Sequence, residues 1–296
     1  MEYDKQLQRI KNSSGFIAAL DQSGGSTPKA LETYGVGSDD YDNDEAMFDM
    51  VHDMRARIIT CKAFDNERVL GAILFEDTME REINGKPTAN YLWEDKNIVP
   101  FLKVDKGLAE QMSGVQVMKP MPNLDLLLDK AKNYPVFGTK MRSVIYEPNV
   151  DGIELVVQQQ FDVAKQIISK GLMPIVEPEV DINSSSKHEC EVILKTNILR
   201  NLERLGDGVQ VMLKLTLPEE AGFYQELIEH PNVLKVVALS GGYSRSDACA
   251  KLKKNPGMIA SFSRAFTEGL SKQQSDSEFA DTISTSIEEI YQASKV

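Results

Sequence analysis

Eight short apolar segments rich in β-branched residues recur along the chain, and they constrain its fold more than any other feature. Their apolar character is nearly continuous rather than alternating, which is typical of strands that are buried on both faces of a parallel sheet. Helical patterns fill the stretches between them. The predicted strands span residues 16–20, 69–75, 98–104, 135–140, 173–179, 210–216, 235–240 and 257–263.

The stretches between the strands carry apolar residues at steps of three and four, which is the pattern of an amphipathic helix. Ile153, Val157 and Phe161 show this spacing, and Gly171 suits the C-terminal end of that helix. The alternation predicts an α/β fold, a (β/α)8 TIM barrel that forms a single domain over residues 1–296 and ends in a C-terminal helix. A doubly wound open sheet is the alternative architecture. Helices are predicted over residues 44–58, 123–132, 151–170 and 276–294.

Two longer segments interrupt this alternation. Residues 22–43 follow the first strand and are rich in Gly, Ser, Asp and Tyr, and residues 79–97 follow the second strand. The second segment contains Asn84-Gly85, a dipeptide that favours a two-residue hairpin turn. Neither segment has the composition of a linker, so no domain boundary is predicted there.

The charge of the chain excludes several classes of partner. Its 33 Lys and Arg residues and 45 Asp and Glu residues give a net charge of −12. Such a chain repels nucleic acids and anionic membranes. The longest apolar run, residues 69–75, is much shorter than the about 20 residues that cross a bilayer, and the first residues lack the features of a signal peptide. We therefore expect a cytoplasmic protein with no nucleic-acid or membrane partner.

The cysteines and histidines argue against a disulfide framework and against a metal site. The chain has three widely separated cysteines, an odd number that is typical of a reducing compartment. None of His52, His188 and His230 lies at a metal-binding spacing from another histidine or from a cysteine. We expect no bound metal.

Polar and charged residues end the predicted strands. In a barrel the C-terminal ends of the strands converge on one face, so side chains at these positions meet. A single charge there more often marks the point where a strand reaches water. Repetition on all eight strands instead predicts an active site. The residues concerned are Asp21, Glu76, Asp77, Lys103, Lys140, Arg142, Glu177, Glu179, Lys214, Ser240 and Arg264.

Lys214 is the most informative of these residues because Leu213 and Leu215 flank it. Burial lowers the pKa of a lysine unless a carboxylate compensates, and a neutral amine can attack a ketone or aldehyde to form a Schiff base. A buried Lys–Glu ion pair is the alternative interpretation. Lys103 and Lys140 also lie in strands, so the residues alone leave open which lysine is the nucleophile.

Glu177 and Glu179 flank Pro178 and therefore face the same side of a strand. Two neighbouring carboxylates do not ionise independently, so one of them can keep a proton and act as a general acid or base. Ion pairs with the nearby lysines are the alternative role, and the two roles are compatible.

Two glycine-containing segments are candidate phosphate sites. Ser240-Gly241-Gly242 and Arg264 follow the last two strands, where barrels of this type commonly bind phosphate. Glycine lets backbone amides approach an anion, and arginine binds it through two donors. The segment Ser23–Lys29 contains Ser26, and Pro28 is predicted to open a helix whose N-terminus would favour a second phosphate.

The sequence resembles the class I, Schiff-base fructose-1,6-bisphosphate aldolases, and more closely a short bacterial branch of that family. The resemblance extends over nearly the whole chain and follows the order of the family's motifs. These are ALDQSGGSTPKAL (19–31), GAILFEDTM (71–79), FLKVDKG (101–107), GTKMRS (138–143), PIVEPE (174–179), VMLKLT (211–216), LSGGYS (239–244) and SFSRA (261–265).

The resemblance implies a reaction and a role for each candidate residue. Fructose 1,6-bisphosphate is cleaved reversibly to dihydroxyacetone phosphate and glyceraldehyde 3-phosphate, in glycolysis and gluconeogenesis, without metal or cofactor. Lys214 would form the Schiff base with the substrate C2 carbonyl. The remaining assignments are Glu177 with Glu179 as acid/base residues, Asp21 as the base for the C4 hydroxyl, Lys140 as an assistant to the Schiff base, Lys103 and Arg142 as substrate ligands, Ser240, Gly241 and Arg264 at the C1 phosphate, and Ser26 at the other phosphate.

The chain also departs from the animal members of this family. Gln22 replaces an acid after Asp21, Ser263 replaces a glycine before Arg264, and the chain ends at Val296 without a C-terminal tyrosine. The alternative functions are cleavage of tagatose or sedoheptulose bisphosphates, a metal-dependent aldolase, and a non-catalytic sugar-phosphate-binding protein. A homo-oligomer is compatible with the sequence.

Overall fold

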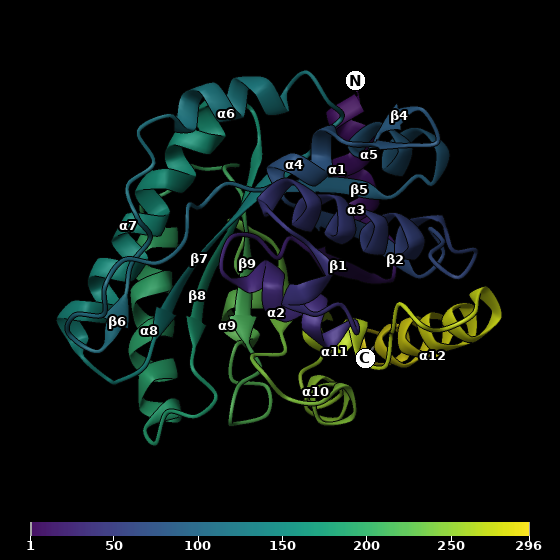
Figure 1. Ribbon diagram of the computed structural model, residues 1–296. Helices are drawn as coiled ribbons and strands as arrows, with labels where there is room; N and C mark the ends of the chain where they lie inside the picture. Colours follow the sequence, from purple (N-terminus) through teal and green to yellow (C-terminus); the bar gives the residue numbers. More distant parts are fainter. Residues whose placement is uncertain (1, 296) are drawn as a thin grey trace.

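A computed structural model describes residues 2–295 and confirms all eight predicted strands. They form one parallel sheet in which spatial neighbours are also neighbours in chain order, and a short ninth strand pairs with β7 (Figure 1). The strands of the barrel are β1 (Phe16–Leu20), β2 (Val69–Leu74), β5 (Val99–Lys103), β7 (Gly138–Ile145), β8 (Met173–Val180), β9 (Val211–Thr216), β10 (Val233–Leu239) and β11 (Ile259–Ala260). The additional strand is β6 (Val115–Gln116).

The first and last strands meet, so the sheet curves into a nearly closed barrel. The amide of Ala19 in β1 donates to the carbonyl of Phe262, just after β11, at 3.3 Å. The strand order never reverses, which excludes the doubly wound open sheet. The predicted TIM barrel is therefore confirmed.

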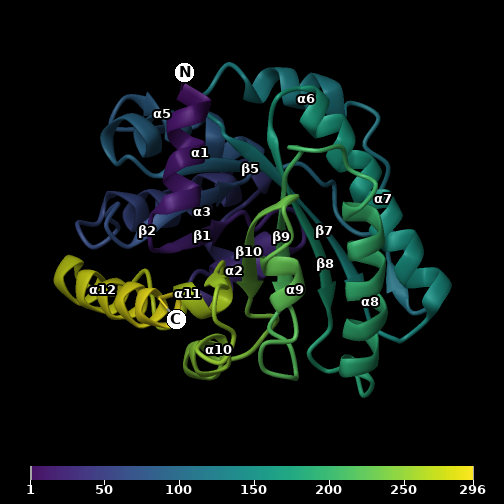
Figure 2. The ribbon, with the colours of Figure 1, turned by 180° about the vertical axis from the view of Figure 1, so that it is seen from behind.

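Helices surround the barrel on its outer face (Figures 1 and 2). The predicted helices are confirmed within two residues as α3 (Asp44–Thr60), α6 (Leu124–Ala131), α7 (Val150–Ser169) and α12 (Asp276–Ala293). The others are α1 (Glu2–Asn12), α2 (Ser26–Thr33), α4 (Glu76–Glu80), α5 (Thr88–Asn90), α8 (Lys187–Leu202), α9 (Gln225–Ile228), α10 (Arg245–Leu252) and α11 (Arg264–Thr267), with short turns of helix at η1 (Ser38–Asp40) and η2 (Tyr91–Asp95). In residues 2–295, no helix combines the length and hydropathy needed to cross a membrane.

The helix α1 was not predicted, and it covers the N-terminal ends of the strands. Ile10 packs with the apolar side chains inside the barrel, and the ring of Tyr3 lies 4.8 Å from that of Phe137. One face of the helix is buried in this way, so packing rather than helix propensity fixes it.

Two local predictions can be compared with the structure. Asn84-Gly85 does form a hairpin turn, between β3 (Glu82–Ile83) and β4 (Lys86–Pro87), and both turn residues have positive φ. The helix after β1 begins at Ser26, so Pro28 lies inside its first turn rather than opening it as predicted. Proline is tolerated there because the first amides of a helix have no intrahelical partner.

Alternation of side chains along the strands explains how charged groups enter the barrel. Val99 and Phe101 of β5 point inward and are fully buried, and the same two-residue repeat turns Lys103 inward next. Met173 and Ile175 of β8 likewise precede Glu177. The barrel is therefore apolar toward its N-terminal end and polar at its C-terminal end.

Gly138 is required by the close approach of β7 and β8. A Cβ atom at this position would lie 2.1 Å from the carbonyl oxygen of Met173, a backbone atom that cannot move without shifting β8.

We predict that Gly138→Ala lowers the free energy of unfolding by about 1–3 kcal/mol, as overpacking does in other cores. Urea denaturation followed by circular dichroism measures this. Gly206→Ala is the control, because its nearest atom would be 3.8 Å away, and equal stability of the two variants would contradict the prediction.

Candidate active site

The candidate residues, except Glu76 and Asp77, lie around one cleft at the C-terminal end of the barrel. Glu76 instead pairs with Lys106 and Lys130, and Asp77 pairs with Arg81, so their prediction as active-site residues is wrong. The cavity measures about 280 Å³, close to the lower end of the range for small-molecule sites. Each of the loops after β1, β10 and β11 contributes to its rim. The candidates that line it are Asp21, Ser26, Lys103, Lys140, Arg142, Glu177, Glu179, Lys214, Ser240, Gly241 and Arg264.

Lys140 lies at the centre of the cleft, between two carboxylates. Its Nζ is 2.7 Å from Oδ2 of Asp21 and 2.9 Å from Oε2 of Glu177. The other oxygen of Glu177, Oε1, lies 3.1 Å from Nζ of Lys214. Lys140, Glu177 and Lys214 are each only 3% exposed. Four charged groups from four strands and strand ends thus form one buried ion-pair network.

The network fixes the charge of its members. Burial by itself would lower the pKa of Lys140, but the charges of Asp21 and Glu177 raise it well above its ordinary value. Burial opposes ionisation of Asp21 as well, yet the charges of Lys140 and Lys214 hold the pKa of Asp21 well below its usual range. At neutral pH Lys140 is therefore an ammonium ion and Asp21 is a carboxylate.

Lys103 has a different environment from the other two lysines. It is the register neighbour of Lys140 on the adjacent strand, and its Nζ contacts both Oδ1 and the carbonyl oxygen of Asp105 at 2.8 and 2.9 Å. Burial lowers the pKa of Lys103, and the charge of Asp105 acts against that shift. Within residues 2–295, Lys214 has a single ionic partner, Glu177.

Glu177 and Glu179 face the same cleft, as predicted, but each carboxylate pairs with its own cations. Nε of Arg142 donates to Oε2 of Glu179 at 2.5 Å. Burial opposes the charge of the guanidinium, but Glu179 raises the pKa of Arg142 above its ordinary value. The backbone amide of Glu177 donates to Oε1 of the fully buried Gln160 of α7 at 2.8 Å, which fixes this point of β8.

The opposite side of the cleft has the features of an anion site. Ser240 is buried at the end of β10, and Gly241 has a φ of +61° that favours glycine. A Cβ on Gly241 would also approach Ile182 to 2.7 Å. The guanidinium of Arg264 lies beside Gly242, 3.5 Å from the position that a Cβ there would take. The backbone at Gly242 and the guanidinium of Arg264 thus lie side by side.

Comparisons with known proteins identify the family. The family described as fructose-bisphosphate aldolase class-I matches residues 2–218. The chain is 59% identical over 290 residues to the class 1 fructose-bisphosphate aldolase of Synechocystis sp., an alignment that covers 98% of this chain and 97% of that protein.

The chain belongs to the class I fructose-bisphosphate aldolases. This aldolase is therefore a metal-independent lyase that reversibly cleaves fructose 1,6-bisphosphate through a lysine Schiff base. The resemblance seen in the sequence is confirmed, and the alternative of a metal-dependent aldolase is wrong.

Solved structures support the fold of the aldolase. A fructose-bisphosphate aldolase from Plasmodium falciparum, solved with TRAP and a small-molecule inhibitor, has a TM-score of 0.80 at 20% identity and covers 99% of this chain and 94% of its own. A protein from Corynebacterium glutamicum has a TM-score of 0.53 at 12% identity, with coverage of 98% and 92%. At these identities the likeness shows the barrel alone.

The aldolase cleft contains further residues to which no role was assigned from the sequence, although Ser263 was noted as a departure from the animal members. Lys29 and Thr33 enter it from α2, Thr267 enters it from α11, and Ser261 and Ser263 flank Phe262. Lys29 lies in the segment predicted to bind phosphate, and Ser261 and Ser263 lie in the SFSRA motif. Ser261 and Ser263 face the cleft because they continue the two-residue repeat that begins at Ile259. This repeat was hard to recognise in the sequence because β11 has only two residues.

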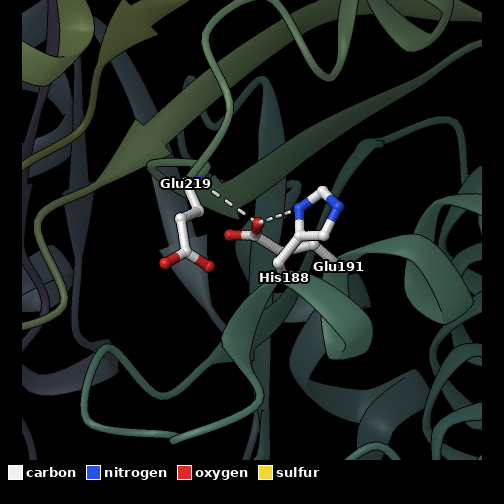
Figure 3. Close-up of side chains that lie close together, drawn as sticks. All are labelled: His188, Glu191 and Glu219. Carbon is white, nitrogen blue, oxygen red and sulfur yellow. Dashed lines mark hydrogen bonds and ion pairs between the residues drawn. The ribbon is translucent and has the colours of Figure 1, made fainter.

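A second group of acidic and histidine side chains lies outside the cleft of the aldolase. Nδ1 of His188 is 3.9 Å from Oε2 of Glu191, and the backbone amide of Glu219 donates to the same oxygen at 3.1 Å (Figure 3). The other oxygen of Glu191 accepts from Lys187, which also donates to the carbonyl of Leu217 at 2.8 Å. The carboxylate is thus fully engaged, and it joins α8 to the segment after β9.

The buried network makes a prediction about stability and pH. Removing the charge of Lys140 takes away the ion-pair partner of Asp21 and one of the two partners of Glu177, so Lys140→Met should cost about 3–5 kcal/mol of unfolding free energy at pH 7. Because the pKa of Asp21 is depressed in the folded protein, its contribution is present above its ordinary pKa of about 4 and is lost as the pH falls below it. The difference between wild type and variant should therefore shrink toward low pH.

Urea unfolding at pH 7 and at about pH 3 measures this difference, because the contribution of Asp21 is still almost complete at its ordinary pKa and falls only below it. Lys106→Met is the control, because the Lys106 side chain is 51% exposed and contacts Glu76 at the surface. It should cost less than about 1 kcal/mol at either pH. A loss in Lys140→Met that does not change with pH would show that the network is not what stabilises the site.

Proposed function

We propose that Lys214 forms the Schiff base in this aldolase, with Glu177 as its acid/base partner. The observation that carries the proposal is the position of the Glu177 carboxylate, which contacts Lys214 at 3.1 Å and Lys140 at 2.9 Å. A carboxylate in this position can take a proton from the amine of Lys214 while the ammonium group of Lys140 remains beside it as a positive charge.

The contacts of the three lysines support this choice of nucleophile. Lys140 stays protonated because two carboxylates raise its pKa, and a protonated amine has no lone pair for attack. Lys103 is held by two oxygens of Asp105. Lys214 shares its partner with Lys140 and lies in the middle of β9, where it can reach a carbonyl placed in the cleft.

The chemistry begins when Nζ of Lys214 gives a proton to Glu177 and attacks the C2 carbonyl. The resulting carbinolamine loses its hydroxyl as water, with Glu177 returning the proton to the leaving oxygen. The product is a protonated imine. Its positive charge makes it an electron sink for the next step, which is the role that a metal ion fills in other aldolases.

Asp21 is placed to start the cleavage. Lys140 and Lys214 keep it ionised, and it lies across the cleft from the carboxylate of Glu177. In the proposed step Asp21 takes the proton from the C4 hydroxyl, and the C4–O bond becomes a carbonyl. The C3–C4 bond breaks and its electron pair moves into the imine, which leaves an enamine on Lys214. Protonation at C3 and hydrolysis of the imine release dihydroxyacetone phosphate.

The charge of the cleft supports a bisphosphate substrate. The chain carries a net charge of −12, yet the cleft is lined by six cationic side chains and only three carboxylates. Local excess of positive charge attracts an anionic substrate. We assign the C1 phosphate to Ser240, Gly241 and Arg264, the second phosphate to Ser26, and the rest of the substrate to Lys103 and Arg142, with Glu179 kept beside Glu177 as the second acid/base carboxylate.

We further propose that the whole chain forms one domain and acts in the cytoplasm. The continuous strand order around the barrel supports one domain. The three cysteines are all free, as expected in a reducing compartment. Exposed apolar side chains on α6, α7 and α8, namely Leu126, Leu155 and Val192, are compatible with association of copies of the chain.

Borohydride trapping tests the nucleophile. Reduction of the enzyme mixed with dihydroxyacetone phosphate should attach one triose phosphate to the peptide that contains Lys214, and Lys214→Met should abolish the adduct. Mass spectrometry of the digested protein makes the measurement. An adduct on Lys103 or Lys140 would overturn the assignment, and no adduct in an active enzyme would overturn the imine mechanism.

A second prediction concerns Glu177. Glu177→Gln keeps the size of the side chain but removes the proton acceptor, so kcat should fall by about 10²–10⁴-fold. Because Lys214 and Lys140 lose their shared carboxylate, the dependence of kcat on pH should also change. Glu76→Gln, on the exposed side of α4 where the carboxylate contacts Lys106 and Lys130, should leave kcat within about twofold of wild type. Equal rates of Glu177→Gln and wild type would exclude Glu177 as the acid/base residue.

A further inference from the structure

A chain of hydrogen bonds leads from a buried arginine to the rim of the cleft. It begins at Arg55 of α3, passes through the side chain of Gln22 after β1, and ends at the hydroxyl of Ser263 after β11. The sequence singled out neither Arg55 nor Thr78, and it marked Gln22 only as a departure from the animal members of the family. In each of these hydrogen bonds, the chemistry of the two groups determines which one donates and which one accepts.

Arg55 is the fixed end of this chain. Its side chain is completely buried, and its guanidinium donates to Oγ1 of Thr78 and to the carbonyl of Gln22, both at 2.5 Å. It also donates to Oε1 of Gln22 at 3.3 Å. Burial lowers the pKa of Arg55 to about 10, so the group remains a cation at neutral pH. A guanidinium can only donate, so the oxygen of the Gln22 amide must face it.

The orientation of Gln22 then determines the state of Ser263. With its oxygen toward Arg55, the amide presents its NH2 group to Oγ of Ser263 at 2.6 Å. An NH2 group can only donate, so the serine oxygen accepts and its own proton must point elsewhere. Within residues 2–295, the Ser263 hydroxyl has no second hydrogen-bond partner.

Ser263, whose hydroxyl proton is not used in this chain, lines the cleft. Ser263 borders the cavity together with Ser240, Gly241 and Arg264. A hydroxyl that already accepts a hydrogen bond is a better donor, because linked hydrogen bonds polarise one another. The natural acceptor at this place is an anion.

We propose that Ser263 is a further substrate-binding residue, whose hydroxyl donates to a phosphate oxygen, and that Gln22 and Arg55 are positioning residues that fix its direction. The inference rests on the proposed assignment of the C1 phosphate to Ser240, Gly241 and Arg264. The hydroxyl of Ser263 would be a neutral donor beside the cationic Arg264. The affinity for phosphate would then also depend on Gln22 and Arg55, which do not touch the phosphate.

Inorganic phosphate is the probe for this inference, as a competitive inhibitor of fructose 1,6-bisphosphate cleavage. Ser263→Ala should raise the inhibition constant of phosphate and the KM of the substrate by about tenfold or more, the usual effect of losing a hydrogen bond to a charged group. The kcat should stay within about twofold, because the bond is the same in ground state and transition state. Ser263→Thr keeps the hydroxyl and should restore phosphate binding.

The direction of the chain is tested by Gln22→Glu. A carboxylate has no proton to donate, so it would accept from both Arg55 and Ser263 and would take the serine proton away from the phosphate. Its added charge acts on phosphate whether or not the serine hydroxyl is present. The inhibition constant should therefore rise more in the wild-type background than in the Ser263→Ala background, and this difference isolates the hydroxyl.

Thr33→Val is the matched control. Thr33 also lines the cleft, but its hydroxyl already donates to the carbonyl of Lys29 at 2.9 Å, so its loss should change the inhibition constant by less than about twofold. Thermal unfolding confirms that each variant is folded. If Ser263→Ala is not, Ser263→Gly, which also lacks the hydroxyl, takes its place as the single variant and as the background for Gln22→Glu.

Arg264→Ala separates the two levels of the proposal. If Arg264→Ala weakens phosphate inhibition while Ser263→Ala and Gln22→Glu do not, the phosphate site stands and the role of Ser263 is wrong. If none of the three changes the inhibition constant, the assignment of the phosphate site is wrong and the inference falls with it. Weakening by all three, with the smaller effect of Gln22→Glu in the Ser263→Ala background, supports the inference.

Discussion

The ammonium group of Lys140 holds two carboxylates together in a place that water hardly reaches, and the rest of the site depends on this interaction. Burying any one of these charges alone would cost several kcal/mol. With Asp21, Glu177 and Lys214 the charges balance, and each group has a partner within 3.1 Å. The arrangement is stable only when β1, β7, β8 and β9 stand in register, so the closed barrel and the ion-pair network require each other.

The barrel supplies this register through the simple geometry of its strands. Every second side chain points inward, and the apolar ones near the N-terminal ends fill the interior beneath the charges. Below Lys103 lies Phe101, and below Glu177 lies Ile175. A packed interior is nearly incompressible, which holds the charged atoms above it at fixed distances. The precision of the site thus comes from the apolar half of the barrel, and its chemistry comes from the polar half.

This geometry also explains what could be predicted from the sequence and what could not. The strands and their terminal charges were predictable because burial on both faces leaves a local signal, as at Lys214 between two leucines. The choice among Lys103, Lys140 and Lys214 was not, because it depends on which carboxylates lie nearby, and those come from other strands. The pairing of Gln22 with Ser263 joins residues 241 positions apart, and only the contact of β1 with the end of β11 brings them together. The sequence marked both positions as departures from animal aldolases without linking them.

The centre and the rim of the cleft use buried cations in different ways. Lys140 lines the cleft, and its charge holds the pKa of Asp21 below its usual range. Arg55 lies behind the rim, and its charge determines which way an amide and then a hydroxyl must point. Donors whose direction is set before the ligand arrives need no reorganisation when it binds, which is the main advantage of a protein site over water. The place where this matters most is the seam between the first and last strands, because the segments that follow β1 and β11 meet there beyond the end of both strands. A hydrogen-bond chain that begins on a fully buried guanidinium gives those segments the fixed direction that strand pairing gives the rest of the barrel.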